Sequence, residues 1–378
     1  MSVDGRNLWL DFIRGLSALL VCLGHLRNAI LVDFSDLAHP NMLLKVFYAL
    51  TGLGHQAVMV FFVLSGYFVG GAILRSGINF SWRNYLTSRL TRLWVVLLPS
   101  LAITWVVGQI LGCFSPEVLA GAYAENWHSG PKADEYSASL TTFLANILFL
   151  QTIVTPVFGI NGPLWSLANE FWYYLLFPLL MIVTGLVGSA SFASRVVTFL
   201  AALAIACYLP NTMLYGFLVW LMGAVVYRLQ SIVKSLNTAK VYIFLLMALA
   251  MFGIALGFAK SSTFAIASDI AVGLTFAMVC LMLTRVSFPA LRWPWLAKLA
   301  LYGSDISYSL YLLHFPLVVL AASLVYQSQK SVPTALFLAQ FLGWVVLLIG
   351  CGFFMWWLFE SRTPIVRKQV NAWLDSTW

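Results

Sequence analysis

Charged side chains are scarce in this 378-residue sequence, at 9% of residues against roughly 25% in soluble domains. With 61% hydrophobic residues and a mean hydropathy of +0.90, this scarcity excludes a soluble globular enzyme, a disordered chain and a fibrous protein. The five cysteines are widely spaced and form no CxxC pair, so neither a disulfide framework nor a thiolate metal site is indicated. No phosphate-binding loop, dinucleotide fingerprint or fixed-period repeat is present. A cleavable signal peptide is also absent, because the first apolar run carries Asp11, Arg14 and His25.

Long apolar runs make up most of the sequence. Several exceed the ~20 residues that cross a bilayer as an α-helix. We therefore predict an all-α, polytopic transmembrane helix bundle, a single membrane-embedded domain over residues 1–378 without a separate extracytoplasmic domain. The ten expected spans lie near 8–31, 47–72, 94–112, 166–187, 196–209, 213–227, 241–258, 266–284, 305–327 and 334–359.

The distribution of basic residues predicts which ends of the spans face the cytoplasm. With the N-terminus inside, the inner segments hold fifteen of the 21 Lys and Arg residues and the outer segments hold five, while Arg14 lies within the first span. An apolar piece at 140–155 is either an eleventh span or a re-entrant or interfacial segment. An eleventh crossing would remove the bias by moving Arg228, Lys234 and Lys240 outside. We therefore expect both termini in the cytoplasm, residues 113–138 outside, and a 140–155 segment that does not cross fully.

Three ionisable residues share one face of the first span. Arg14 and His25 are eleven residues apart, almost three helical turns, and Asp11 lies one turn before Arg14. Ionisable groups inside a membrane nearly always face the protein interior and mark a functional path. Asp11 and Arg14 could instead form an ion pair that anchors the helix at the cytoplasmic interface, so both interpretations of Asp11 stay open.

Five stretches, in order, resemble the acyltransferase 3 family of bacterial membrane acyltransferases. They are Asp11–His25 with its arginine, ten residues and histidine; Phe61–Tyr67 (FFVLSGY); the basic segment Arg83–Pro99; Pro163–Glu170 (PLWSLANE) with Tyr174 and Pro178; and Ser307–Pro316 (SYSLYLLHFP). The resemblance covers about residues 8–364. One departure is the wider spacing of Glu360 and Pro364 after the last span.

The resemblance implies transfer of an acyl group, preferably acetyl, from cytoplasmic acetyl-CoA to a hydroxyl of an envelope, lipid-linked or secreted glycan, in the bacterial cytoplasmic (inner) membrane. We expect no metal and no nucleic-acid partner. The implied catalytic residues are His25, Arg14 and Glu170. The implied donor-binding residues are Arg83, Arg89, Arg92 and Arg14, and the implied substrate-binding residues are Asp11, Trp165, Tyr174, Tyr311 and His314.

The residues themselves support these roles to different degrees. A histidine can take the proton of an attacking alcohol near neutral pH, which fits His25 as a base or as an acyl carrier. Glu170 has Tyr173 and Tyr174 one turn on, so it either binds a hydroxyl or is a buried carboxyl satisfied by tyrosine. His314 precedes Pro316 and could be a structural histidine bonded to the carbonyl that the proline frees. The arginines of 83–92 suit phosphates, although topology alone also explains basic residues there.

Two other classes of function compete with the enzyme. In a proton-coupled transporter, Asp11, Arg14, His25 and Glu170 would form a proton relay. Against this, the sequence shows neither the internal repeats nor the paired broken helices of many transporters. A lipid-binding or scaffold protein would leave the buried ionisable groups without a purpose.

Overall fold

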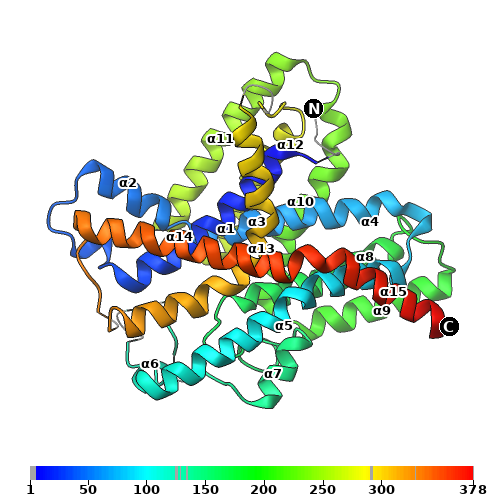
Figure 1. The fold of residues 1–378 in the computed structure, drawn as a ribbon. Coiled ribbons are helices and arrows are strands. Elements are labelled where there is room, and N and C mark those ends of the chain that lie inside the picture. Colours follow the sequence, from blue (N-terminus) through cyan, green and yellow to red (C-terminus); the bar gives the residue numbers. More distant parts are fainter. Residues whose placement is uncertain are drawn as a thin grey trace. The chain divides into compact units, whose positions relative to one another are not determined.

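The computed structural model describes residues 6–123, 127, 129–132, 135–289, 293–327 and 329–377. Helices make up 78% of the chain, and the described part holds isolated β-bridges but no strand, which confirms the all-α prediction (Figure 1). The helices are α1 (Leu8–Ile30), α2 (Met42–Thr51), α3 (Gly54–Ser65), α4 (Gly71–Ser76), α5 (Trp82–Phe114), α6 (Pro116–Leu119), α7 (Leu140–Ile147), α8 (Leu164–Val183), α9 (Phe192–Tyr208), α10 (Asn211–Val233), α11 (Thr238–Ser261), α12 (Ala265–Leu283), α13 (Pro294–Leu324), α14 (Ala335–Leu358) and α15 (Thr363–Thr377).

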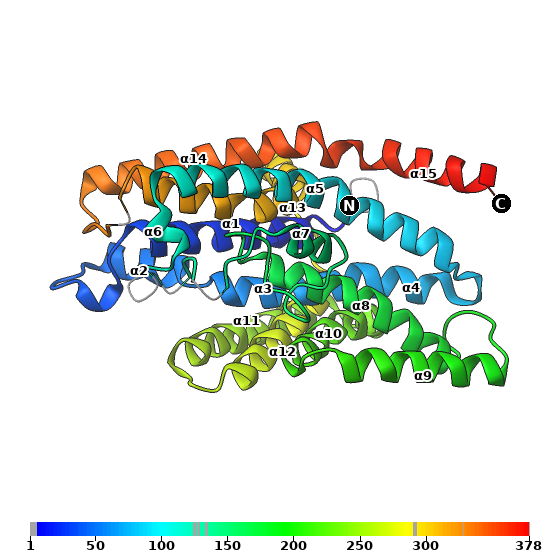
Figure 2. The ribbon, with the colours of Figure 1, turned by 90° about the horizontal axis from the view of Figure 1, so that it is seen from below.

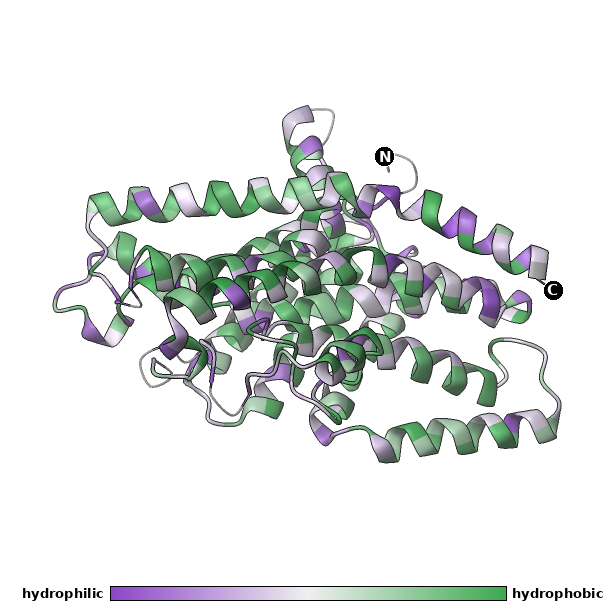
Figure 3. Ribbon diagram, turned by 60° about the horizontal axis from the view of Figure 1, so that its bottom comes forward, coloured by the Kyte–Doolittle hydropathy of each residue, from purple (hydrophilic) through white to green (hydrophobic). Residues whose placement is uncertain are grey.

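Nine segments of the described chain are long and apolar enough to cross a membrane, which makes this a multi-pass membrane protein. The remaining expected span, 196–209, corresponds to α9, whose 17 residues fall at the lower end of the length that crosses a bilayer. Helix α7 has eight residues and a rise of about 12 Å, too short for a crossing helix. Hydrophobic residues line the long helices, and hydrophilic ones gather in the connections and in the C-terminal helix (Figure 3).

Three boundaries differ from the prediction. The expected span 47–72 is interrupted after Thr51, so that α2 ends there and the crossing helix starts at Gly54 and runs through a π-helical segment, Gly66–Gly70, into α4. Helices α5 and α13 begin at Trp82 and Pro294, about eleven residues before the expected starts. Hydropathy detects only the part of a helix that lies in hydrocarbon, so polar first turns escape it.

Contacts divide the chain into two compact units, each built from three segments. Unit 1 holds Met1–Ser17, His55–Tyr85 and Asn169–Ser304, and unit 2 holds Ala18–Gly54, Leu86–Ala168 and Asp305–Trp378. In unit 1, α12 packs against both α10 and α11 (Figure 2). In unit 2, Gly352 of α14 lies against Leu310 of α13, where a side chain in place of the glycine would come within about 3.0 Å of Leu310.

Glycines bring α10 of unit 1 close to α3 and to the π-helical segment. A Cβ on Gly66 would lie 1.8 Å from the carbonyl oxygen of Trp220, and one on Gly223 would lie 1.9 Å from that of Val63. Small residues at such crossings allow backbones in membranes to approach closely. This packing positions Ser65 and Trp220, whose hydrogen bonds to the Glu170 cluster are described below.

Candidate active site

His25 of α1 and His314 of α13 form a hydrogen-bonded pair inside unit 2. Nδ1 of His25 lies 2.8 Å from Nε2 of His314, and the two ring planes are within 9° of parallel. His314 is 1% exposed, whereas His25 is partly exposed. The pair therefore connects a buried imidazole to one that belongs to a partly exposed residue.

Backbone carbonyls determine the tautomers of this pair. Nδ1 of His314 lies 2.8 Å from the oxygen of Tyr311 and 3.1 Å from that of Leu310. A carbonyl oxygen only accepts, so this nitrogen carries the proton and Nε2 of the neutral ring is an acceptor. Nδ1 of His25 must then donate to it, which leaves the lone pair on Nε2 of His25. A base whose ring is oriented by a third group is the arrangement that activates a hydroxyl nucleophile.

Polar side chains hold α13 next to His314. Pro316 has no N–H, so the carbonyl of Leu312 loses its helical partner. Ser100 Oγ and Asn161 Nδ2 donate to this oxygen instead, at 2.8 and 3.0 Å. The prediction that a structural His314 would bond the freed carbonyl is therefore wrong, because the histidine bonds carbonyls that the proline leaves in place.

Aromatic rings and the connection between α6 and α7 lie beside His25. The ring of Phe315 meets that of His25 edge-on at 4.9 Å, and Trp127 lies 6.5 Å from Phe315. Ser129 Oγ accepts from Nε1 of Trp127 at 3.2 Å and from Nδ2 of Asn28 at 2.8 Å. Asn28 is one turn after His25, so the segment between α6 and α7 is attached to α1 directly beyond the histidine.

The expected residues at the start of α1 form a separate cluster in unit 1. Asp11 is 4% exposed and accepts from Nε of Arg6 at 2.9 Å and from Oγ of Ser304 at 2.8 Å. Nη2 of Arg14 donates to Ser304 Oγ and lies 3.5 Å from Asp11 Oδ1. The guanidinium also lies over the ring of Phe68, at 5.7 Å. The carboxylate and the hydroxyl thus orient Arg14, and the expected Asp11–Arg14 contact is present.

Glu170 belongs to a second polar cluster of unit 1. Its Oε1 accepts from Ser65 Oγ at 2.7 Å and from the Tyr174 hydroxyl at 2.5 Å, and Trp220 Nε1 donates to Ser65 Oγ at 3.0 Å. Tyr173 was expected near the carboxylate, but its hydroxyl donates to the carbonyl of Met213 instead. Oε2 of Glu170 accepts no hydrogen bond from the described residues, so one oxygen is available for a ligand.

The motif residues Trp165 and Tyr311 lie in unit 2. The Tyr311 hydroxyl is 2.7 Å from Ser166 Oγ and donates to the carbonyl of Pro163 at 3.2 Å, and its ring lies 5.9 Å from that of His314. Trp165 is partly buried at the start of α8. The two motifs 163–170 and 307–316 therefore meet directly beside the histidine pair.

Three of the four expected donor-binding arginines, Arg83, Arg89 and Arg92, lie in the first turns of α5, whereas Arg14 lies in α1. Arg83 and Arg92 are exposed, and Arg89 is partly buried. Nη2 of Arg89 donates to Ser88 Oγ at 3.3 Å, and Nη1 of Arg367 donates to the same oxygen at 3.3 Å. The hydrogen bond from Arg367 to Ser88 joins residues 279 apart in sequence, so α15 also contributes to the basic segment.

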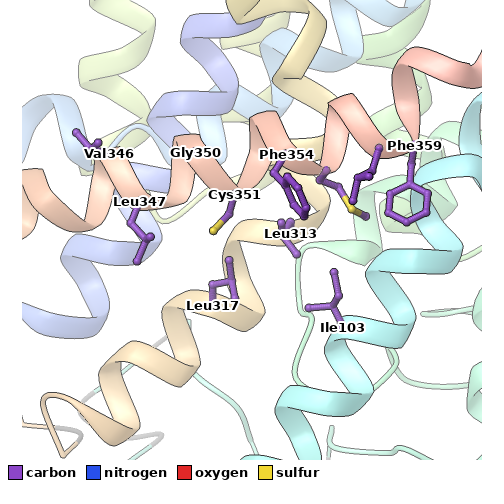
Figure 4. Close-up of a pocket in the computed structure, with 11 residues that line it drawn as sticks. Ile103, Leu313, Leu317, Val346, Leu347, Gly350, Cys351, Phe354 and Phe359 are labelled. Atoms are coloured by element: carbon purple, nitrogen blue, oxygen red, sulfur yellow. The ribbon is translucent and has the colours of Figure 1, made fainter.

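An apolar cavity of about 580 Å³ lies between α5, α13 and α14 of unit 2 (Figure 4). Leu313, Leu317, Ile103 and Phe354 are among its lining residues, none of which is charged. Such a lining suits alkyl chains and offers no partner to a phosphate. The described residues contain no group of three or more His, Cys, Asp or Glu side chains that could hold a metal ion.

Sequence reasoning missed the groups that connect these residues. Ser304 bonds both Asp11 and Arg14, Ser65 bonds Glu170, and Ser88 joins two arginines. Serine is common in helices of membrane proteins, and its spacing from the ionisable residues carries no periodic signal. Two of them lie within motifs that the sequence showed, Ser65 in Phe61–Tyr67 and Ser88 in Arg83–Pro99, but nothing in the sequence marked the serines themselves.

Comparison with known proteins gives one result. The family model Acyl_transf_3, described as an acyltransferase domain, matches residues 7–360 of the chain. No curated protein and no solved structure matches it. The match includes both histidines, the first turns of α5 and both clusters of unit 1 apart from Arg6, and it ends before α15.

Proposed function

Because the chain belongs to the acyltransferase 3 family and is a membrane acyltransferase, we propose that it transfers an acetyl group from cytoplasmic acetyl-CoA to a hydroxyl of an envelope, lipid-linked or secreted glycan. We place it in the bacterial inner membrane with both termini in the cytoplasm. The observation that carries the proposal is the hydrogen bond between His25 and His314, which leaves a lone pair on a partly exposed imidazole.

The proposed reaction uses His25 twice. Nε2 of His25 takes the proton of the acceptor hydroxyl while its oxygen attacks the thioester carbonyl carbon. The tetrahedral intermediate then expels the sulfur of coenzyme A, the C–S bond breaks, and the His25 imidazolium returns the proton to the thiolate. The products are the O-acetyl ester and free coenzyme A.

His314 supports both states of His25. Its Nε2 accepts from Nδ1 of His25 before and after proton transfer, so the positive charge on the imidazolium has a fixed hydrogen-bond partner. Backbone carbonyls hold the proton on the far nitrogen of His314. His314 is therefore a positioning residue in this mechanism rather than a direct substrate ligand.

Within unit 1, each of the two clusters has its own role in the proposal. Arg14, oriented by Asp11 and Ser304, supplies positive charge for a donor phosphate or for the oxyanion. Glu170 uses its uncommitted oxygen to accept from an acceptor hydroxyl, beside Tyr174. Trp165 and Tyr311 border the region where the acceptor would lie.

The experiment is acetyl transfer from labelled acetyl-CoA by the purified full-length protein in detergent, with hydrolysis counted as transfer to water. We expect the wild-type protein to release coenzyme A and His25→Ala to lose on the order of 10²-fold or more in kcat, as for removal of a general base. His39→Ala is the matched control, because His39 is exposed and lies outside the site. Transfer by His25→Ala within a few-fold of wild type would remove His25 from the mechanism.

A further inference from the structure

Arg89 of α5 and Arg367 of α15 converge on one hydroxyl of unit 2. Each guanidinium donates to Ser88 Oγ at 3.3 Å, so the two positive groups lie within a few ångströms of each other. Neither forms an ion pair with a carboxylate among the described residues. Two close cations without an anion repel each other, and a bound anion would remove this repulsion.

Unused donors surround the same point. Nε of Arg89 is buried and has no hydrogen-bond partner in the described chain. Ser88 Oγ accepts two N–H groups, and its own hydrogen reaches no acceptor among the residues that the structure describes. A buried unpaired donor is costly, so a ligand rich in acceptor oxygens would stabilise the site.

We propose that Arg367 of α15, together with Ser88, adds a phosphate contact to the donor-binding segment that the family resemblance places at Arg89, and that the ligand is a phosphate of the acyl donor. Arginine presents planar, bidentate donors that match phosphate oxygens, and serine adds an O–H. Arg367 lies beyond the residues matched by the family model, so α15 supplies a ligand contact outside the family domain. The inference rests on the proposed function, because it takes acetyl-CoA as the donor.

The position of the site along α5 fits a donor with a long arm. Ser88 and Ser100 are twelve residues apart on this helix, a rise of about 18 Å, and Ser100 bonds the carbonyl of Leu312, two residues before His314. The arm between the diphosphate and the sulfur of coenzyme A has about twelve bonds, the length of four extended residues or roughly 14 Å. A phosphate at Ser88 thus leaves the thioester near the depth of the histidine pair.

The test compares Arg367→Ala with Lys368→Ala, two neutralisations of neighbouring exposed residues of α15. Lys368 is rotated by about 100° from Arg367 on the helix, so its side chain points in another direction. Both substitutions remove one positive charge, so the two variants have the same net charge. We expect Arg367→Ala to weaken acetyl-CoA binding about tenfold in calorimetry and to raise KM by the same factor with little change in kcat. Lys368→Ala should stay within twofold of wild type, and Arg367→Lys should recover only part of the binding.

A second donor and defined lipids identify the ligand. Acetyl-pantetheine has the arm and the thioester but no phosphate, so its KM should not change in Arg367→Ala. An equal loss of affinity with both donors, an equal loss in Lys368→Ala, or no loss at all would overturn the phosphate site.

Nanodiscs with and without phosphatidylglycerol test whether a lipid headgroup is the ligand. The assignment to the donor is overturned if Arg367→Ala changes only the response to that lipid. A wild-type protein that releases no coenzyme A contradicts the proposed function, whereas normal turnover with an unaffected Arg367→Ala contradicts this inference alone.

Discussion

In the hydrogen bond between the two histidines, the buried His314 accepts and the partly exposed His25 donates. Two backbone carbonyls of α13 determine this direction, because they hold the proton of His314 on its other nitrogen. This direction leaves Nε2 as the unprotonated nitrogen of His25, on the side of the ring away from His314. Substitution of His314 should therefore affect the reaction through the orientation of His25 and leave donor binding intact.

We expect His314→Leu to lower kcat about tenfold to a hundredfold with KM for acetyl-CoA within twofold of wild type, because the base loses its orienting acceptor. His314→Gln should recover part of this loss, since its amide oxygen can accept from Nδ1 of His25. Steady-state kinetics of the two variants, with melting temperatures in detergent, check this. If Gln is no better than Leu, His314 has a packing role only.

The residues of this site were predictable one at a time, but their contacts were not. Asp11 and Arg14 are one turn apart, so helical spacing alone brings them together. His25 and His314 are 289 residues apart. No periodicity relates positions on different helices, because their contact depends on how α1 and α13 pack. For the same reason the sequence gives no sign that Arg367, one of the fifteen basic residues assigned to the inner segments, lies near Arg89.

Among the helices, glycines allow α10 to approach α3 and the π-helical segment closely. The long apolar helices follow directly from hydropathy, because a bilayer accepts few alternatives to a helix. The break after Thr51 and the early starts of α5 and α13 depend on turns outside hydrocarbon, where the apolar signal ends. The close approach at Gly66 and Gly223 was not predictable either, because nothing in the sequence distinguishes a glycine packed against another helix from one in open space, such as Gly253.

Gly66→Ala should destabilise the protein, because the added methyl would overlap the carbonyl oxygen of Trp220 on α10. Overpacking of this kind costs about 1–3 kcal/mol or more. Thermal unfolding in detergent measures the effect. The matched control is Gly253→Ala on α11, where nothing lies within 4 Å of an added Cβ; equal melting temperatures for the two variants would contradict the packing described for α3 and α10.

For the molecule as a whole, the direction of the chain through the membrane depends on α9. With α9 as a crossing helix the chain crosses ten times and both termini face the same side; without it they face opposite sides. The positive-inside distribution favours ten crossings, with Arg195 and Arg228 on the inner side.

Single cysteines introduced into a protein without its five native cysteines test this topology. We expect Ser189→Cys and Ser231→Cys to be labelled from the cytoplasmic side and Ala122→Cys and Asn211→Cys from the outer side; all four positions are exposed. A membrane-impermeant maleimide applied to intact cells and to inverted vesicles distinguishes the two sides. Labelling of Ser189→Cys and Asn211→Cys from one side would show that α9 does not cross.

The length of α9 also links the protein to its lipid surroundings. Seventeen residues of helix rise about 25 Å, less than the ~30 Å of a typical hydrocarbon core. Such a mismatch is met by local thinning of the bilayer, at a cost of fractions of a kcal/mol per ångström. Lipids with shorter acyl chains remove this cost, so a crossing α9 predicts that the protein melts at a higher temperature in bilayers of such lipids.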